Sequence, residues 1–325
     1  MGSLKKHVGF KERILKSKKI FIIGVAGDSG SGKTTFVKGI QNMFGSDMVC
    51  NFSLDDYHTL DREGRAKKKL TALNPEANNL EGLYKDLVKL KKGETIMKPV
   101  YEHATGKFGK PVKFEPKPIV IIEGLMPFYT EELRSIIDFK IFVDPERSVK
   151  RKWKIKRDVG DRGHKIEDVM PEIIAREPDY KKYIDFEKIY AEVVIKIRPT
   201  KFVDILGHSD TVSIRLIQRL LEIPTEHLDL SIDLSKLLQV TKSNFSLDFE
   251  GGDYYGYNVS MITMDGTIPE NVLEDLQERI LEFIGSANGN IFTSEFSSAT
   301  DLTQLLIAWR FLEKIDYILN NDCKK

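Results

Sequence analysis

A glycine-rich segment with a lysine and a threonine is the first place where residue types and spacing could do chemistry. Residues 27–34 read Gly-Asp-Ser-Gly-Ser-Gly-Lys-Thr, a complete G-x-x-x-x-G-K-T pattern. Its glycines let the backbone curl so that successive N–H groups point inward at phosphate oxygens. Lys33 adds a mobile positive charge, and the hydroxyl of Thr34 can hold Mg²⁺. The segment therefore predicts that the protein binds a nucleoside triphosphate. The predicted nucleotide-binding residues are Gly27, Asp28, Ser29, Gly30, Ser31, Gly32, Lys33, Thr34 and Thr35.

Two adjacent aspartates could supply further chemistry. Asp55 and Asp56 follow the apolar segment Met48–Phe52. A phosphoryl-transfer enzyme needs a base near the acceptor hydroxyl and carboxylates near Mg²⁺, and the pair could divide these tasks. Alternatively, either aspartate could cap the turn that follows. The phosphate-binding segment in the same chain favours the catalytic interpretation.

A third acid, Glu123, follows the apolar segment Ile119–Ile122 and precedes Gly124. This is the position of a Walker B acid, which holds Mg²⁺ directly or through water. An acid after an apolar strand is common by itself. In this context we expect Thr34 and Glu123 to hold the Mg²⁺ that accompanies ATP.

A basic segment, residues 146–165, contains nine Lys or Arg residues against three acids. Such a run is usually a solvated helix face. Arg157-Asp158 and Arg162-Gly163-His164, however, lie where nucleotide kinases place a lid over the phosphates, so we expect this segment to contact phosphate. Four of its charged residues have the spacing of one helix face: Lys150, Lys154, Arg157 and Asp158.

Alternating elements must position these groups. Short apolar segments that read as buried strands alternate with segments of helical periodicity, which predicts a mostly parallel sheet flanked by helices. Ligands of such sheets bind at the carboxyl ends of the strands, where the acids above are found. We also expect Asp144 to cap the next helix, with Pro145 in its first turn. The predicted strands are Lys19–Ala26, Met48–Phe52, Ile119–Ile122, Phe139–Val143 and Val193–Ile197, and the predicted helices include Leu80–Leu90 and Pro145–Val159.

The pattern changes after Pro199, which suggests a division of the chain at about that point. Val212–Gln218 and Asn258–Met264 alternate like strands, whereas Pro269–Ile284 and Leu302–Leu319 read as long amphipathic helices. We therefore expect a P-loop kinase-like α/β core over residues 1–200. A smaller α+β region over residues 201–325 should extend its sheet.

Composition excludes several other classes of protein. The 325 residues carry a net charge of +1, which gives no reason to expect nucleic-acid binding. Two cysteines, Cys50 and Cys323, argue against a disulfide framework and suit a reducing compartment. The first 19 residues lack the apolar stretch of a signal peptide, and no run reaches the length of a membrane span. We expect a cytoplasmic protein.

Several longer strings are far more specific than the phosphate-binding segment alone. They are Ser53–Arg65, Thr71–Asn79, Lys98–Gly106, Ile122–Leu125, Trp153–Asp158 with Arg162–His164, and Tyr255–Ser260. Together these strings resemble the phosphoribulokinase family in its plant, cyanobacterial and archaeal branch, and the resemblance runs from about Ile20 to the last predicted helix.

This resemblance implies transfer of the γ-phosphoryl group of ATP to O1 of D-ribulose 5-phosphate, with Mg²⁺ as cofactor and a homodimeric enzyme. Asp55 matches the catalytic base, while Lys33, Thr34 and Glu123 match nucleotide and Mg²⁺ groups. Arg157 and Asp158 match a pair near the reacting phosphates whose separate duties stay open. The positions that match sugar-phosphate contacts are His58, Arg62, Tyr101, His103, Lys154 and Arg162.

The chain departs from the photosynthetic members of that family at two positions. Those enzymes carry one cysteine in the phosphate loop and another just before the catalytic aspartate, and oxidation links the two. Ser31 and Ser53 stand at the matching positions here. Cys50 lies three residues before Ser53, which points it to the opposite face of a strand. We therefore expect activity that does not respond to thiol oxidation.

Two other functions compete with this interpretation. A uridine kinase-like enzyme would share the core, but its nucleoside acceptor has no phosphate to occupy Arg62, His103 and Lys154. A nucleotide-driven switch without transfer activity is the other alternative, because Asp61–Gly64 fits a D-x-x-G pattern. The chain has no N-K-x-D guanine motif, and it retains a candidate base in Asp55.

Overall fold

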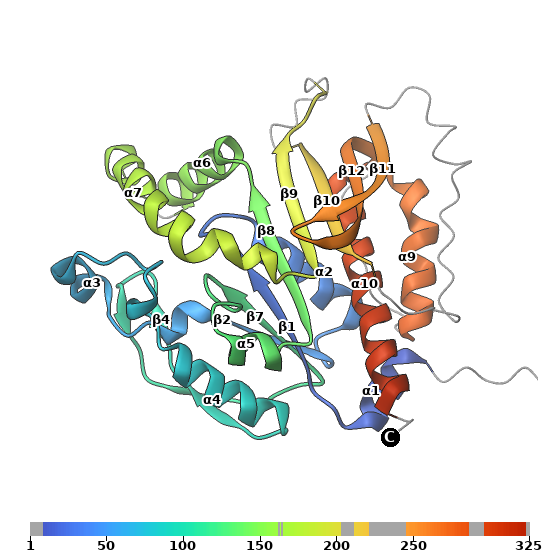
Figure 1. Ribbon diagram of the computed structural model, residues 1–325, viewed down its shortest axis with the longest axis horizontal. Helices are drawn as coiled ribbons and strands as arrows, with labels where there is room; N and C mark the ends of the chain where they lie inside the picture. The colour runs from blue at the N-terminus through green and yellow to red at the C-terminus, as the bar shows by residue number, and fades with distance from the viewer. Residues whose placement is uncertain are drawn as a thin grey trace, which may run out of the picture.

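The computed structural model describes residues 9–161, 163, 165–202, 211–220, 245–285 and 296–322. Five parallel strands form the centre of one large sheet, with β2, β7, β1, β8 and β9 as successive neighbours. All six residues of β1 are buried, as expected for a strand with helices on both faces. The predicted parallel sheet is therefore confirmed (Figure 1). The central strands are β1 Phe21–Ala26, β2 Val49–Ser53, β7 Ile119–Gly124, β8 Phe139–Pro145 and β9 Val193–Pro199.

The C-terminal part of the chain extends this sheet with antiparallel strands. β10 pairs with β9, β12 pairs with β10, and β11 and β13 both pair with β12. The expected extension of the sheet is thus confirmed. These strands are β10 Val212–Arg219, β11 Phe245–Tyr254, β12 Tyr257–Pro269 and β13 Phe296–Ser298. Two small ribbons beside the sheet consist of β3 Ile96–Lys98 with β6 Val112–Phe114, and β4 Tyr101–Glu102 with β5 Lys107–Phe108.

Helices cover both faces of the sheet, because alternate residues of each strand point to opposite sides. Phe21 and Ile23 of β1 belong to one core with α1, α2, α9 and α10, and Ile22 belongs to a second core with α4 and α5. The helices are α1 Phe10–Ser17, α2 Lys33–Phe44, α3 Arg62–Lys68, α4 Leu80–Lys91, α5 Glu131–Ile136, α6 Arg147–Ile155, α7 Ile166–Asp179, α9 Glu270–Ile284 and α10 Ala299–Asp322. Single turns occur at η1 Leu54–Tyr57, η2 Pro75–Ala77, η3 Lys156–Asp161, η4 Tyr180–Ile184 and η5 Asp185–Ile189.

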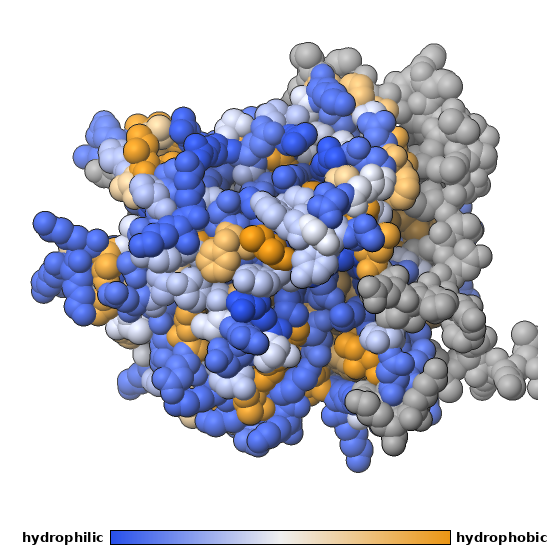
Figure 2. All heavy atoms as spheres, in the orientation of Figure 1, coloured by the Kyte–Doolittle hydropathy of each residue, from blue (hydrophilic) through white to orange (hydrophobic). Residues whose placement is uncertain are grey.

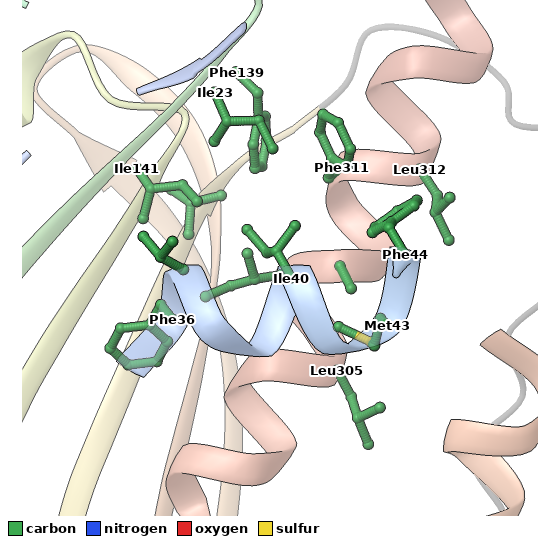
Figure 3. Close-up of a cluster of buried hydrophobic side chains, with 14 of the residues drawn as sticks. Ile23, Phe36, Ile40, Met43, Phe44, Phe139, Ile141, Leu305, Phe311 and Leu312 are labelled. Carbon is green, nitrogen blue, oxygen red and sulfur yellow. The ribbon is translucent and has the colours of Figure 1, made fainter. Parts of the chain in front are cut away.

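The last helix holds the helix of the phosphate loop in place. Figure 3 shows Phe36 and Ile40 of α2 and Phe311 of α10 pointing into one apolar cluster with the sheet. Gln304 of α10 donates from Nε2 to the carbonyl oxygen of Thr35 at 2.9 Å. The C-terminal part of the chain therefore contributes directly to the position of the phosphate loop.

The prediction for the start of α6 is wrong. Asp144 and Pro145 end β8, and α6 begins at Arg147 with Glu146 at its N-cap position. The hydroxyl of Tyr180 donates to the Asp144 carboxylate at 3.5 Å, and Lys188 Nζ lies 3.8 Å from it. Asp144 thus serves tertiary contacts rather than a cap. Within the described ranges, no helix combines the length and apolar character needed to cross a bilayer.

Candidate active site

A cavity of about 710 Å³ lies beyond the carboxyl ends of the parallel strands. Its walls come from the loop after β1, from η1 after β2, from β4 and its loop, and from α6 and α7. In Figure 1, α6 and α7 lie above this region and α3 lies below it. The surface over these helices is mostly hydrophilic in Figure 2. The cavity therefore stands where a sheet of this type binds its ligands.

The predicted phosphate loop joins β1 to α2, so the motif has the strand–loop–helix context that it needs. Gly27 has a φ of 150°, and a Cβ there would lie 2.7 Å from the carbonyl oxygen of Val143. Only glycine fits this close approach. Gly32 occupies the N-cap position of α2 without a capping side chain, which leaves the N-terminal amide groups available for an anion.

Lys33 is held against its own loop. Its Nζ donates to the carbonyl oxygens of Gly27 at 2.9 Å and of Asp28 at 2.8 Å. Burial lowers the pKa of Lys33, and the carboxylates of Asp55 and Glu123 oppose that effect. An incoming phosphate would offer this amino group a stronger acceptor than two neutral carbonyls.

Thr34 and Glu123 meet at the predicted Mg²⁺ site. The Thr34 hydroxyl donates to Glu123 Oε2 at 3.2 Å, and burial raises the pKa of the Glu123 carboxyl. A hydroxyl and a carboxylate are hard oxygen donors that fit Mg²⁺, which keeps several waters and shares substrate phosphates. Across the described part of the chain, no group of three or more His, Cys, Asp or Glu side chains forms a dedicated metal cage.

The two adjacent aspartates have different surroundings. Asp55 faces the cavity, where its Oδ2 lies 3.2 Å from Nε2 of His103 and its Oδ1 lies 3.8 Å from Nε2 of His58. Burial acts to raise the pKa of Asp55, but His103, His58 and Lys33 together hold it well below its usual range. Asp55 is therefore ionised at neutral pH and can accept a proton.

Asp56 points away from this chemistry. Its carboxylate pairs with Lys98 and accepts the backbone N–H of Tyr101 at 2.8 Å. It thereby fastens the β4 segment beside η1. Neither aspartate caps the turn, because the side chain of Ser53 accepts the N–H of Asp55 at 3.3 Å.

Aromatic and basic side chains form the wall opposite the phosphate loop. The ring of Tyr101 makes edge contacts with His58 and His103, at centroid separations of 5.0 and 5.4 Å. Arg62 donates to the carbonyl oxygen of His103 at 2.7 Å. Arg65, which the sequence interpretation did not select, lines the same wall and donates to the Tyr101 hydroxyl at 2.9 Å.

The basic segment packs over the phosphate loop. Lys154 Nζ donates to Asp158 Oδ2 at 2.6 Å, and Arg157 Nε donates to Asp158 Oδ1 at 2.9 Å. Burial acts to raise the pKa of Asp158, but these two cations lower it to about 2. Arg157 Nη2 also donates to the Ser29 hydroxyl at 3.2 Å. Residues 146–161 and α7 are called the lid below.

The structure brings most of the predicted site residues into one cavity. Gly27 and Asp28 belong to the loop but do not line the cavity, and Arg162 lies outside the described residues. The lining residues that were not among the predicted site residues include Arg65, Trp153, Glu172 and Arg176. Arg65 and Trp153 fall inside the strings that carried the resemblance. Nothing in the sequence around Glu172 and Arg176 distinguishes them from surface charges.

Comparisons with known proteins show the family to which the chain belongs. Residues 22–204 match the family model described as Phosphoribulokinase / Uridine kinase family. The chain is 45% identical to the phosphoribulokinase of Synechocystis over 201 residues, which are 62% of this chain and 60% of the relative. It is 38% identical to the chloroplastic phosphoribulokinase of Chlamydomonas reinhardtii over 284 residues, which cover 79% of this chain and 75% of the relative.

A solved structure shows the same fold. The phosphoribulokinase from Rhodobacter spheroides superposes with a TM-score of 0.54 at 19% identity, over 82% of this chain and 99% of that chain. The family match covers more than half of the sequence, and the Chlamydomonas relative is matched over three quarters of its length. The chain therefore belongs to the phosphoribulokinase / uridine kinase family.

Proposed function

We propose that this protein is a phosphoribulokinase, which transfers the γ-phosphoryl group of ATP to O1 of D-ribulose 5-phosphate. The products are ribulose 1,5-bisphosphate and ADP. One observation carries the proposal: an ionised, partly buried aspartate, Asp55, lines the same cavity as a phosphate loop and a separate wall of cationic and aromatic side chains. A kinase for an acceptor that already carries a phosphate needs this combination of a base and two anion sites.

Asp55 is the proposed base. It would take the proton from the acceptor hydroxyl as that oxygen attacks the γ-phosphorus, and ADP would leave from the opposite side. His58 and His103 orient the carboxylate through their contacts of 3.8 and 3.2 Å. The low pKa of Asp55 keeps the base ionised, although it limits the proton-transfer driving force until substrate binds.

The nucleotide side of the site uses the phosphate loop and the lid. Lys33 would leave its loop carbonyls for the β- and γ-phosphates, and Arg157 would stabilise charge on the transferring group. Asp158 orients both Arg157 and Lys154 through its two carboxylate oxygens. Mg²⁺, held by Thr34 and Glu123, would neutralise phosphate charge when bound.

The opposite wall would bind the sugar phosphate. A phosphate dianion and a chain of hydroxyl groups call for fixed cations and ring donors, which this wall supplies within one cavity. The proposed sugar-phosphate residues are His58, Arg62, Tyr101 and His103 of this wall, together with Lys154 and Arg162 of the basic segment. A nucleoside would leave the cations of this wall without an anionic partner, which disfavours the uridine kinase alternative.

A substrate panel tests the proposal. Purified protein with Mg²⁺ and ATP is given ribulose 5-phosphate, ribose 5-phosphate or uridine, and ADP release is followed with a coupled assay. We expect turnover with ribulose 5-phosphate and little with the other two acceptors. Preference for uridine would replace the proposal with the nucleoside kinase. If none of the three acceptors supports ADP release, the result would favour a nucleotide switch.

We also propose that the enzyme is a homodimer, as the family resemblance implies. Analytical ultracentrifugation at micromolar concentration would measure the mass directly. A monomer that remains fully active would contradict this assembly.

A further inference from the structure

The side chain of Asp28 in the phosphate loop faces the lid rather than the cavity. Its carboxylate is buried, with 8% of the residue exposed. Oδ2 accepts from Lys150 Nζ at 3.0 Å, and Oδ1 accepts from Arg176 Nη2 at 3.1 Å and from the backbone N–H of Ser29 at 2.7 Å. Lys150 belongs to α6 and Arg176 belongs to α7. One loop carboxylate therefore joins both lid helices.

The two lid cations are themselves enclosed. The side chains of Lys150 and Arg176 are 11% and 15% exposed, and Lys150 Nζ lies 4.1 Å from the centroid of the Tyr180 ring. Burial acts to raise the pKa of Asp28, but Arg176 and Lys150 lower it to about 2. The three charges thus form a compact and largely dehydrated group between the loop and the lid.

The same group borders the cations proposed to act on phosphate. Arg176 Nη1 lies 3.5 Å from Glu172 Oε1, and the same oxygen lies 3.3 Å from Lys154 Nζ. Arg157 reaches the loop at Ser29, next to Asp28. Four cations converge on this small volume, so their mutual repulsion must be offset before they can be held together. They are Lys150, Lys154, Arg157 and Arg176.

We propose that Asp28 is a positioning residue that anchors the lid to the phosphate loop and so presets Lys154 and Arg157 for phosphoryl transfer. This inference rests on the proposed function, because it assigns the purpose of the lid cations. Asp28 would not touch the reacting atoms. It would act through Lys150 and Arg176, whose helices carry or flank the groups that do. Removing one partner of a buried ion pair leaves the other charge uncompensated, so the lid should shift away from the loop.

Kinetics of Asp28→Asn test this role. We expect kcat to fall roughly tenfold or more, because small displacements of positioned groups are costly. The KM for ATP should change by less than about threefold, since Arg176 lines the cavity and the nucleotide phosphates can themselves partner it. Asp28→Glu keeps the charge and should recover part of kcat. Asp47→Asn is the matched control, because Asp47 is an exposed acid paired with Lys11.

A double-mutant cycle separates positioning from a general loss of stability. If Asp28 acts through Arg176, the kcat effects of Asp28→Asn and Arg176→Gln should be strongly non-additive. Each variant is assayed well below its melting temperature. The proposal would be overturned if the kcat reductions of the two single variants multiply in the double variant. It would also be overturned if the kcat of Asp28→Asn stays within about twofold of wild type, or if Asp28→Glu recovers none of the lost kcat. If Asp28→Asn does not fold, the same double-mutant cycle is measured with Asp28→Glu and Arg176→Gln.

Tryptophan fluorescence tests the anchor without any sugar substrate. The chain has two tryptophans, and Trp153 in α6 packs against the loop, where a Cβ at Gly32 would lie 3.3 Å from its ring. In a Trp309→Phe background, emission reports Trp153 alone. We expect Asp28→Asn to shift this emission to the red and MgADP to reverse the shift. Identical emission in both proteins would contradict the anchor. Failure of the wild type to use ribulose 5-phosphate would contradict only the proposed function.

Discussion

Asp55 and Asp56 show what single residues decide in this site. They are adjacent and chemically identical, yet Asp55 faces two histidines in the cavity while Asp56 pairs with Lys98 and holds the Tyr101 backbone. The sequence indicated that the pair could share catalytic tasks. Only the tertiary position of β4 separates the proposed base from a structural ion pair.

Replacing the proposed base should abolish most activity. We expect Asp55→Asn to bind ATP normally and to lose roughly 10²–10⁴-fold in kcat, the usual contribution of a general base. Steady-state kinetics and MgATP titration measure the two quantities, with Asp47→Asn as the matched control. Retention of more than about a third of wild-type kcat would remove Asp55 from this role.

Substitutions of the cationic residues on the two sides of the cavity should have different effects on KM and kcat. Arg62→Ala and His103→Ala remove the proposed contacts to the sugar phosphate, so they should raise its KM far more than the KM for ATP. Arg157→Ala should instead lower kcat, because charge spreads over the γ-phosphoryl oxygens in the transition state. The three variants are compared under one set of conditions. Equal changes in the KM values for both substrates would show that these residues have been assigned to the wrong substrate.

The site residues that the sequence could identify were those tied to a local pattern. The phosphate loop and Asp55 each follow a strand and Glu123 is the penultimate residue of β7, so their convergence follows from the geometry of a parallel sheet. Glu172 and Arg176 lie on α7, far along the chain from the loop that Arg176 contacts. Their role depends on how the lid folds back, which no local spacing encodes.

At the scale of elements, apolar runs predicted the strands well because buried parallel strands are continuously hydrophobic. The predicted run Val193–Ile197, for example, lies within β9 at Val193–Pro199. The start of α6 was wrong because Asp-Pro also suits the end of a strand. Asp144 there satisfies contacts to Tyr180 and Lys188 that are distant in sequence.

The turn η5 contains a buried acid that should make stability depend on pH. Glu187 is fully buried, accepts the backbone N–H of Phe128 at 2.8 Å, and has no hydrogen-bond partner for Oε1 among the described residues. Burial raises its pKa well above the usual value. The folded state therefore holds this proton more tightly than the unfolded state does. The stability that this proton contributes is complete below the unfolded pKa and is lost as pH rises toward the folded pKa.

Glu187→Gln removes this titration. We expect the variant to gain free energy of unfolding relative to wild type as pH rises from about 4 to 8, with the smallest gain at the acid end. Urea unfolding across that range measures the difference. Glu12→Gln, an exposed acid paired with Lys16, is the control. A difference that is constant with pH would mean that Glu187 is already charged in the folded protein.

Strand β2 carries the cysteine that bears on redox control. Cys50 is half-buried beside the second core, its sulfur accepts the Lys117 N–H at 3.3 Å, and burial raises the pKa of its thiol. A neutral, shielded thiol reacts slowly with oxidants and disulfides. Ser31 and Ser53 stand at the two positions where the family resemblance implies a bridging pair of cysteines, and Cys323 lies outside the described residues.

Activity should therefore be insensitive to thiol oxidation. Rates are compared after incubation with oxidised and with reduced dithiothreitol, and Cys50→Ser serves as the reference that cannot oxidise at this position. We expect equal rates throughout. A severalfold loss on oxidation that reduction restores, and that Cys50→Ser prevents, would assign a switch to Cys50.

At the scale of the whole molecule, the sequence division near residue 200 marks a change of pattern within one sheet. β10 pairs with β9 in seven successive positions, from Val212 opposite Pro199 to Gln218 opposite Val193. α10 also packs on α2, where a Cβ at Gly39 would lie 2.7 Å from Gln304. The contact between α10 and α2 joins segments hundreds of residues apart, so sequence periodicity could predict the elements but not which of them would meet.

We propose that this fold places a phosphate loop, a base and a sugar-phosphate wall so that one phosphoryl group moves to O1 of ribulose 5-phosphate. Phosphorus NMR of the reaction mixture tests it directly. With Mg²⁺, ATP and ribulose 5-phosphate, we predict a second sugar phosphomonoester signal that coincides with added ribulose 1,5-bisphosphate and grows in step with ADP. Asp55→Asn should form neither the bisphosphate nor ADP at a comparable rate. ADP formed without the bisphosphate, or a product phosphorylated at another hydroxyl, would contradict the account.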